Sequence, residues 1–175
     1  ENLHQSKTIS PATFPILSAN SPLESNLRHA KLLSPYNYAH RIRHSTDYLI
    51  IHESAGDSAA TVEALHQRDV SAHYAVTENG LILNLIDSNR VARHAGYSMW
   101  DGEKYLNGNS ISIEMVTTNP LEMPKVQVNA GKAWIDSLQA QYNIPNKRVL
   151  GHSTVRTDPT FTRRTDKVCM GINHA

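Results

Sequence analysis

The chain of 175 residues has a single cysteine, almost no net charge and no long apolar run. One cysteine cannot form an intramolecular disulfide, and a chain of this length can bury the core of one domain without such a crosslink. The 17 Lys and Arg residues against 16 Asp and Glu leave a formal charge of +1, which argues against nucleic-acid binding by phosphate neutralisation. The sequence has no run of about 18 apolar residues, which is the pattern that predicts a membrane-spanning helix.

The first 33 residues show no sustained hydrophobic period and mix proline, serine and asparagine with scattered apolar residues. This composition predicts an extended N-terminal arm or linker over 1–33, followed by one folded domain over 34–175. The sequence begins at Glu1 rather than at methionine, so we expect that an export signal or a lipid anchor could precede it.

Beyond the arm, the hydrophobic pattern changes between the periods of strands and helices. Asn79 and Gly80 predict a two-residue hairpin turn in which both positions take positive φ, and 110–117 alternates like a strand with one face on the core. In chain order we expect a strand over 48–52, a helix over 58–69, a hairpin over 73–86, a strand over 110–117, a helix over 126–142 and a strand over 148–152. This order predicts an α/β fold, a single domain with a central mixed β-sheet flanked by helices.

Histidine is the residue type that stands out, with ten copies. Imidazole binds metals and transfers protons near neutral pH. His52 and His152 each end a predicted strand, and both imidazoles emerge at one edge of the sheet if those strands are neighbours. A carboxylate or thiolate from the loop after His152 would then complete three protein ligands for Zn²⁺, which leaves the fourth position to water as in catalytic zinc sites.

Several short motifs in a fixed order make the sequence resemble a known family. They are SPYNY (34–38), YLIIH (48–52), SAHY (71–74), RHAGYSMW (93–100), LN (106–107), SISIE (110–114), VLGHS (149–153) and TDP (157–159). Together they are similar to the type 2 N-acetylmuramoyl-L-alanine amidases, the zinc peptidoglycan amidases related to phage lysozyme-type amidases and to peptidoglycan recognition proteins. The resemblance extends from about residue 34 to about residue 161.

The resemblance implies a role for each residue that falls on a family motif. His52 and His152 are expected as zinc ligands, with Asp158 as the third. Glu114, at the end of the SISIE motif, is expected to orient or deprotonate the attacking water. Without the motif, the same residue on an alternating strand would be taken as solvated.

Two other residues compete with Asp158 for the role of third ligand. Cys169 lies in KVCMG, which resembles the Lys-x-Cys-Pro-Gly of the branch with a thiolate ligand. Asp166 repeats the Arg-Thr-Asp pattern that precedes Asp158. The TDP motif favours Asp158, so we rank it first, then Cys169 and then Asp166.

Arg156 stands where this branch of the family usually has lysine, two residues before the third ligand. It keeps the positive charge, so we expect it to stabilise the oxyanion of the reaction. The resemblance also implies a substrate groove along one edge of the sheet. The remaining expected site residues lie in family motifs and are expected to contact substrate in this groove: His94, Tyr97, Trp100 and Asn107.

The implied function is hydrolysis of the amide between the lactyl group of N-acetylmuramic acid and the L-alanine of the stem peptide, with Zn²⁺ as cofactor. The alternative is a module of the same fold that binds muropeptide without cutting it. We expect a monomer in the cell envelope (periplasmic, outer-membrane-anchored or secreted), with peptidoglycan or muropeptide as partner and no nucleic acid. The sequence leaves open a role in recycling, in wall remodelling, as a phage lysin or as a toxin, and the choice between whole sacculi and anhydro-muropeptides.

Overall fold

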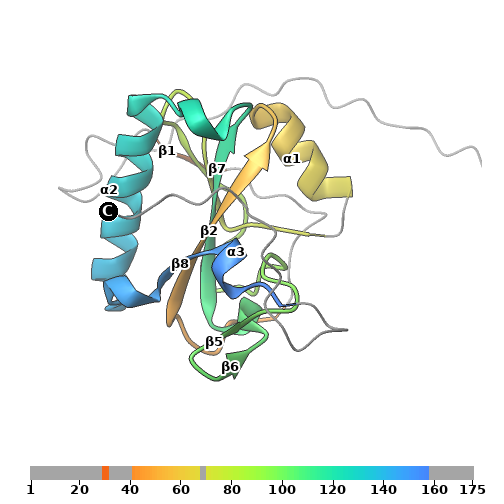
Figure 1. The fold of residues 1–175 in the computed structure, drawn as a ribbon, viewed down its shortest axis with the longest axis vertical. Coiled ribbons are helices and arrows are strands. Elements are labelled where there is room, and N and C mark those ends of the chain that lie inside the picture. The colour runs from red at the N-terminus through yellow and green to blue at the C-terminus, as the bar shows by residue number, and fades with distance from the viewer. Residues whose placement is uncertain (1–28, 32–40, 68–69, 158–175) are drawn as a thin grey trace, which may run out of the picture.

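The computed structural model describes residues 29–31, 41–67 and 70–157. The six strands of its main sheet are β1 (His29–Lys31), β2 (Tyr48–Ala55), β3 (Tyr74–Val76), β4 (Ile82–Asn84), β7 (Ser110–Thr117) and β8 (Val149–Gly151). The helices are α1 (Ser58–Gln67), α2 (Lys125–Tyr142) and the short α3 (His152–Val155). Figure 1 shows α2 on one side of the sheet, with α1 and α3 on the other. The predicted α/β architecture, a mixed sheet flanked by helices, is confirmed.

In the described part of the chain, the smaller elements are a hairpin and three single-turn helices. The hairpin pairs β5 (Met99–Trp100) with β6 (Glu103–Lys104) in antiparallel fashion. The 3₁₀ turns are η1 (Leu106–Gly108), η2 (Pro120–Glu122) and η3 (Asn146–Arg148). Among the described residues, no helix combines the length and the apolar character needed to cross a membrane.

The strand order of the main sheet is β1-β4-β3-β7-β2-β8. Only the β3–β4 pair, a hairpin, is antiparallel, and every other neighbouring pair is parallel. β2 therefore lies between β7 and β8, although these strands are far apart in the chain. The neighbour relation on which the metal prediction depended is confirmed.

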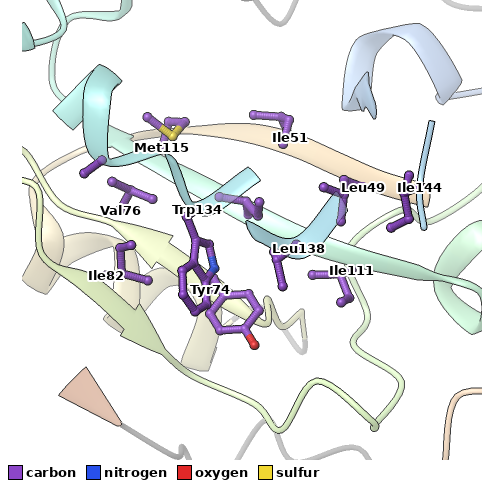
Figure 2. Packing of buried hydrophobic residues seen from close by; sticks show 12 residues of the cluster. Leu49, Ile51, Tyr74, Val76, Ile82, Ile111, Met115, Trp134, Leu138 and Ile144 are labelled. Carbon is purple, nitrogen blue, oxygen red and sulfur yellow. The ribbon is translucent and has the colours of Figure 1, made fainter. Parts of the chain in front are cut away.

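Strand β7 is the central strand, and its alternating sequence separates two different environments. Its odd-numbered apolar residues face α2 and pack against Trp134 and Leu138, as Figure 2 shows for Ile111 and Met115. The polar residues Ser110, Ser112 and Glu114 lie on the opposite face. All eight residues of the strand are buried, so the polar face is covered by protein rather than by water.

Helix α2 covers one face of the sheet through a stripe of residues at the helical period. Leu138 and Trp134 join Leu49 and Ile51 of β2 in the largest apolar cluster (Figure 2). Asn143 ends the helix in the left-handed conformation, with φ of 56°, and its N–H reaches the carbonyl of Gln139. The predicted helix and its stop are confirmed to within one residue.

The turn chemistry differs from the prediction in two places. The hairpin at Asn79-Gly80 is present, but only Gly80 has positive φ (77°). The backbone N–H of Thr77 donates to the carbonyl of Leu81, so the turn inside this hydrogen-bonded pair has three residues, 78–80, rather than two. The two-residue turn with positive φ at both positions occurs instead in the β5–β6 hairpin, at Asp101 (48°) and Gly102 (82°), where the sequence reasoning did not expect it.

Two predicted boundaries also change. Strand β2 does not end at His52 but continues to Ala55, because β7 pairs with it over its full length. Most of the predicted arm over 1–33 lies outside the described residues, although residues 29–31 form β1 and pair with β4 at one edge of the sheet. The division into an arm and a domain stays a prediction.

We predict that Leu138→Ala destabilises the fold through the α2 packing. Leu138 is only 1% exposed, and removing a buried leucine side chain costs about 2 to 5 kcal/mol through lost burial and the cavity left behind. Urea denaturation should show this loss, whereas Val128→Ala, on the same helix at 47% exposure, should change the unfolding free energy by less than about 0.5 kcal/mol. Equal losses would contradict the packing assigned to α2.

Candidate active site

Three polar side chains from distant parts of the sequence meet on the sheet face opposite α2. His52 on β2 and Glu114 on β7 are direct cross-strand partners in the parallel register. Ile51 pairs with Gly151 on the other side of β2, which places His152 beside His52. The register of two parallel strand pairs therefore assembles this group, because a parallel ladder aligns residues without any local sequence relation.

The two histidines lie ring against ring, with centroids 4.5 Å apart. Nε2 of His152 is 3.3 Å from the carbonyl oxygen of Ala95, and Nε2 of His52 is 3.1 Å from Nδ1 of His94. Burial lowers the pKa of both imidazoles, that of His52 well below its usual range. Both rings are thus neutral at physiological pH, which is the form that binds a metal.

Glu114 is a buried carboxyl group, with 8% of its surface exposed. Its Oε1 atom lies 3.9 Å from Nδ1 of His52, so it faces the ring nitrogen that His94 does not occupy. Burial raises its pKa to about 7, because the low-dielectric surroundings disfavour the charged form. A carboxyl group with this pKa can take up and return a proton near neutral pH. The reading of Glu114 as a solvated strand residue is wrong.

The segment of His94 and Ala95 runs behind both histidines and is held in place by one side chain. Oδ1 of Asn107, in η1, accepts hydrogen bonds from the backbone N–H groups of His94 (3.0 Å) and Ala95 (2.7 Å). His94 is buried, and its Nε2 atom lies 3.1 Å from Oγ of Ser110 on β7. In the described structure Asn107 and His94 therefore support the histidine pair, and substrate contacts for them stay a prediction.

Arg156 and Tyr97 border the site on the side of the β5–β6 hairpin. Ser98 forms an antiparallel bridge with Arg156, and the carbonyl of Tyr97 accepts from the N–H of Thr157 at 2.8 Å. Burial is the main cause that lowers the pKa of His152, and the charge of Arg156 acts in the same direction. Arg156 is exposed and so available to a bound group.

The two predicted aromatic contacts differ in exposure. Tyr97 is 53% exposed, and its ring lies 6.1 Å from that of Tyr105, which is 64% exposed. Trp100 packs against an apolar cluster that includes Tyr48 and Leu150. Tyr97 is thus open to a ligand, whereas Trp100 contributes to the core at this end of the sheet.

The donor set fits one metal ion with two nitrogen ligands, because two neutral imidazoles stack side by side and each uses Nε2 in another contact. Within 29–31, 41–67 and 70–157, no group of three or more His, Cys, Asp or Glu residues is placed to hold a metal. All three candidates for the third ligand, Asp158, Asp166 and Cys169, lie outside the described residues. The choice among them stays open.

Sequence reasoning missed the serine partners of two buried histidines. Ser110 and Ser112 precede Glu114 at spacings of four and two residues on the same strand face, and each contacts a buried histidine, His94 and His73 respectively. The alternation of the SISIE motif contained this signal. The contact of the Ala95 carbonyl with His152 could not be predicted from the sequence, because every residue type has the same backbone carbonyl group.

These elements define a class of site: neutral histidines beside a buried carboxyl group at one level of a mixed sheet. This combination is typical of hydrolases that use a single metal ion. The family model for N-acetylmuramoyl-L-alanine amidases (Amidase_2) matches residues 42–168. The chain belongs to this family.

Named relatives agree with this assignment. The amidase AmiD of Escherichia coli K12 is 30% identical in an alignment 125 residues long that covers 61% of this chain and 45% of AmiD. The 1,6-anhydro-N-acetylmuramyl-L-alanine amidase AmpD of Salmonella typhimurium LT2 is 32% identical over 104 residues, 59% of this chain and 53% of AmpD. The chain thus spans about half the length of the curated relatives it matches.

Solved structures share the fold. AmpDh3 of Pseudomonas aeruginosa, in complex with anhydromuramic pentapeptide, superposes with a TM-score of 0.59 at 29% identity, over 65% of this chain and 55% of that one. Escherichia coli AmiD, in complex with anhydro-N-acetylmuramic acid-L-Ala-D-gamma-Glu-L-Lys, gives a TM-score of 0.58 at 27% identity, over 69% and 55% of the two chains.

The buried position of His73 leads us to predict that the protein loses stability in mild acid. Burial is the main cause that lowers its pKa from 6.5 to about 4, so the unfolded chain takes up this proton at a higher pH than the folded one does. The stability that the protein gains from keeping His73 neutral is complete above pH 6.5 and is lost as the pH falls from 6.5 to about 4. Between pH 7 and pH 5 the free energy of unfolding should fall by about 2 kcal/mol.

Urea denaturation of the wild type and of His73→Gln at pH 7 and pH 5 checks this expectation. The variant should lose about 2 kcal/mol less than the wild type over this range, because it no longer takes up the proton on unfolding. Equal losses in the two proteins would show that His73 titrates normally in the fold.

Proposed function

We propose that this chain is a zinc-dependent amidase that hydrolyses the bond between the lactyl group of N-acetylmuramic acid and the L-alanine of the peptidoglycan stem peptide. One observation carries the proposal: the buried carboxyl group of Glu114, with its pKa raised to about 7, faces Nδ1 of His52 at 3.9 Å. The muropeptides bound in the AmpDh3 and AmiD structures support this class of substrate.

His52 and His152 would hold the metal, together with one of Asp158, Cys169 and Asp166. When bound, zinc would supply a Lewis acid that makes a water molecule more acidic and polarises a carbonyl group. The histidines suit this role because both are neutral and each uses Nε2 elsewhere.

Glu114 would carry the proton. Its carboxylate takes a proton from the attacking water and then delivers it to the amine nitrogen of L-alanine as the amide bond breaks. Its surroundings suit both steps, because a pKa near neutral pH allows the group to accept and to donate. Glu114 lies beside His52 on the neighbouring strand, so the proton carrier and the metal ligands share one rigid sheet.

Arg156 and Tyr97 would act on the substrate. The guanidinium group of Arg156 would stabilise the negative charge that develops on the lactyl carbonyl oxygen. Tyr97, exposed next to the site, would pack against the sugar or the peptide. Peptidoglycan or muropeptide would be the partner, and the cell envelope (the periplasm, the outer membrane or the exterior) would be the place of action.

We predict that Glu114→Gln loses hydrolysis while zinc binding persists. The amide cannot accept a proton as the carboxylate does, so kcat should fall by about 10² to 10⁴-fold. Liquid chromatography and mass spectrometry of muropeptides digested by the wild type should show free stem peptides and glycan without peptide, and both products should be lost with the variant.

The same experiment separates the enzyme from a binding module. Purified wild type that binds zinc and muropeptide but releases no stem peptide from sacculi or from anhydro-muropeptides would contradict the proposed function. Unchanged hydrolysis by Glu114→Gln would instead leave the amidase but remove Glu114 from the mechanism.

The third metal ligand predicts a second series of variants. Asp158→Ala, Asp166→Ala and Cys169→Ala, made separately, should differ sharply in zinc stoichiometry, because a site with three protein ligands loses most of its affinity with any one of them. Elemental analysis after dialysis should find zinc absent from one variant and present in the other two. Full zinc in all three would contradict this set of candidates.

A further inference from the structure

A chain of hydrogen bonds runs from the backbone to the candidate metal site through two buried side chains. Oγ of Ser110 lies 2.5 Å from the carbonyl oxygen of Leu106 and 3.1 Å from Nε2 of His94. Nδ1 of His94 lies 3.1 Å from Nε2 of His52. Ser110 and His94 are buried, so neighbouring protein atoms, rather than water, satisfy these groups.

The donor and the acceptor of each hydrogen bond in this series follow from its last member, the carbonyl group of Leu106. The carbonyl oxygen of Leu106 can only accept, so the Ser110 hydroxyl donates its proton there. Oγ of Ser110 is then the acceptor for His94, whose Nε2 must carry hydrogen. A neutral imidazole carries one hydrogen, which leaves Nδ1 of His94 as an acceptor. Nε2 of His52 therefore donates, and the lone pair of His52 lies on Nδ1, the nitrogen that faces Glu114.

The position of the hydrogen on the His152 ring is fixed in the same way, by Ala95, the residue next to His94. Its Nε2 atom contacts the carbonyl oxygen of Ala95, which can only accept, so the lone pair of His152 also lies on Nδ1. His94 and Ala95 are adjacent, and Asn107 holds both of their backbone N–H groups. The His94-Ala95 segment thus determines which ring nitrogen carries hydrogen in both histidines. It acts on His52 through the His94 side chain and on His152 through the backbone carbonyl of Ala95.

We propose that His94, backed by Ser110, is a positioning residue that holds His52 in the tautomer and ring orientation needed to present Nδ1 to the metal. This inference rests on the proposed function, because it takes His52 as a metal ligand. It differs from the expected role of His94 in substrate contact, since the ring lies behind His52 and uses both nitrogens in hydrogen bonds. Partners of this kind raise metal affinity by orienting the ligand.

Ser110→Ala is the direct test. Without the serine oxygen, Nε2–H of His94 has no acceptor, so His94 gains by moving its hydrogen to Nδ1 and donating to His52. His52 must then carry its own hydrogen on Nδ1, the nitrogen needed for the metal. We expect zinc affinity, measured by competition with a chromophoric chelator, to fall about 10- to 100-fold.

The strand itself offers a matched control. Ser112 is two residues further along the same face of β7, is equally buried, and contacts the buried His73 through its hydroxyl at 3.0 Å. Ser112→Ala removes the same atom and leaves the His94 chain intact, so zinc affinity should stay within about twofold of the wild type. Equal losses for Ser110→Ala and Ser112→Ala would overturn the proposal, because a general packing defect would then explain both.

A second readout needs no metal. Long-range ¹H–¹⁵N NMR spectra of the zinc-free protein distinguish the two neutral tautomers by the ¹⁵N shifts of the ring. The wild type should show hydrogen on Nε2 of His52, and Ser110→Ala should shift the population to hydrogen on Nδ1. An unchanged tautomer in a folded Ser110→Ala protein would overturn the proposal. A wild type without zinc affinity would contradict the proposed function, while these spectra would still decide the proton order.

A rescue pair at His94 completes the test. In His94→Asn the side-chain oxygen can accept from Nε2 of His52 near the position of Nδ1, whereas His94→Leu has no polar atom. We expect His94→Asn to retain at least tenfold more zinc affinity than His94→Leu. Equal affinities for the two variants would contradict the assigned role, and their melting temperatures identify any difference that comes from unfolding.

Discussion

The parallel register of β2 with its two neighbours is the constraint on which the candidate site depends. Because His52 pairs with Glu114 and Ile51 pairs with Gly151, the three candidate side chains reach one level of the sheet, two from strands β2 and β7 and that of His152 from the start of α3, directly after β8. A shift of either register by one residue would turn side chains to the opposite face. The packing of α2 opposes such a shift, since it buries the alternate residues of the same strands.

The central strand gives the two faces of the sheet different tasks. Its apolar residues form the core against α2, and its polar residues face buried imidazoles instead of water. Burying polar groups is costly unless they are hydrogen bonded, and here Ser110 and Ser112 each bond to a histidine. Glu114 lies 3.9 Å from the ring nitrogen of His52, and the desolvation that comes with its burial raises its pKa. The same burial thus produces a rigid frame and a carboxyl group with a raised pKa.

Much of the fold could be predicted from the sequence, because its signals are local. Apolar runs and the helical period located β2, β8 and α2, and the SISIE alternation located β7. Turn chemistry was less reliable: the two-residue turn expected at Asn79-Gly80 occurs at Asp101-Gly102. Both dipeptides suit such a turn, and the length of the connection that the flanking strands require decides between them. The extent of β2 was also underestimated, since pairing with β7 prolongs it beyond the apolar run.

For the candidate site, the sequence by itself singled out His52, His152 and Glu114, because these residues fall on short motifs in a fixed order. It also determined the family and the class of fold. Only the tertiary structure decided that these residues meet, that Glu114 is buried rather than solvated, and that His94 lies behind His52. The physical reason is that burial and proton order depend on neighbours from distant parts of the chain, including a backbone carbonyl that has no identity in the sequence.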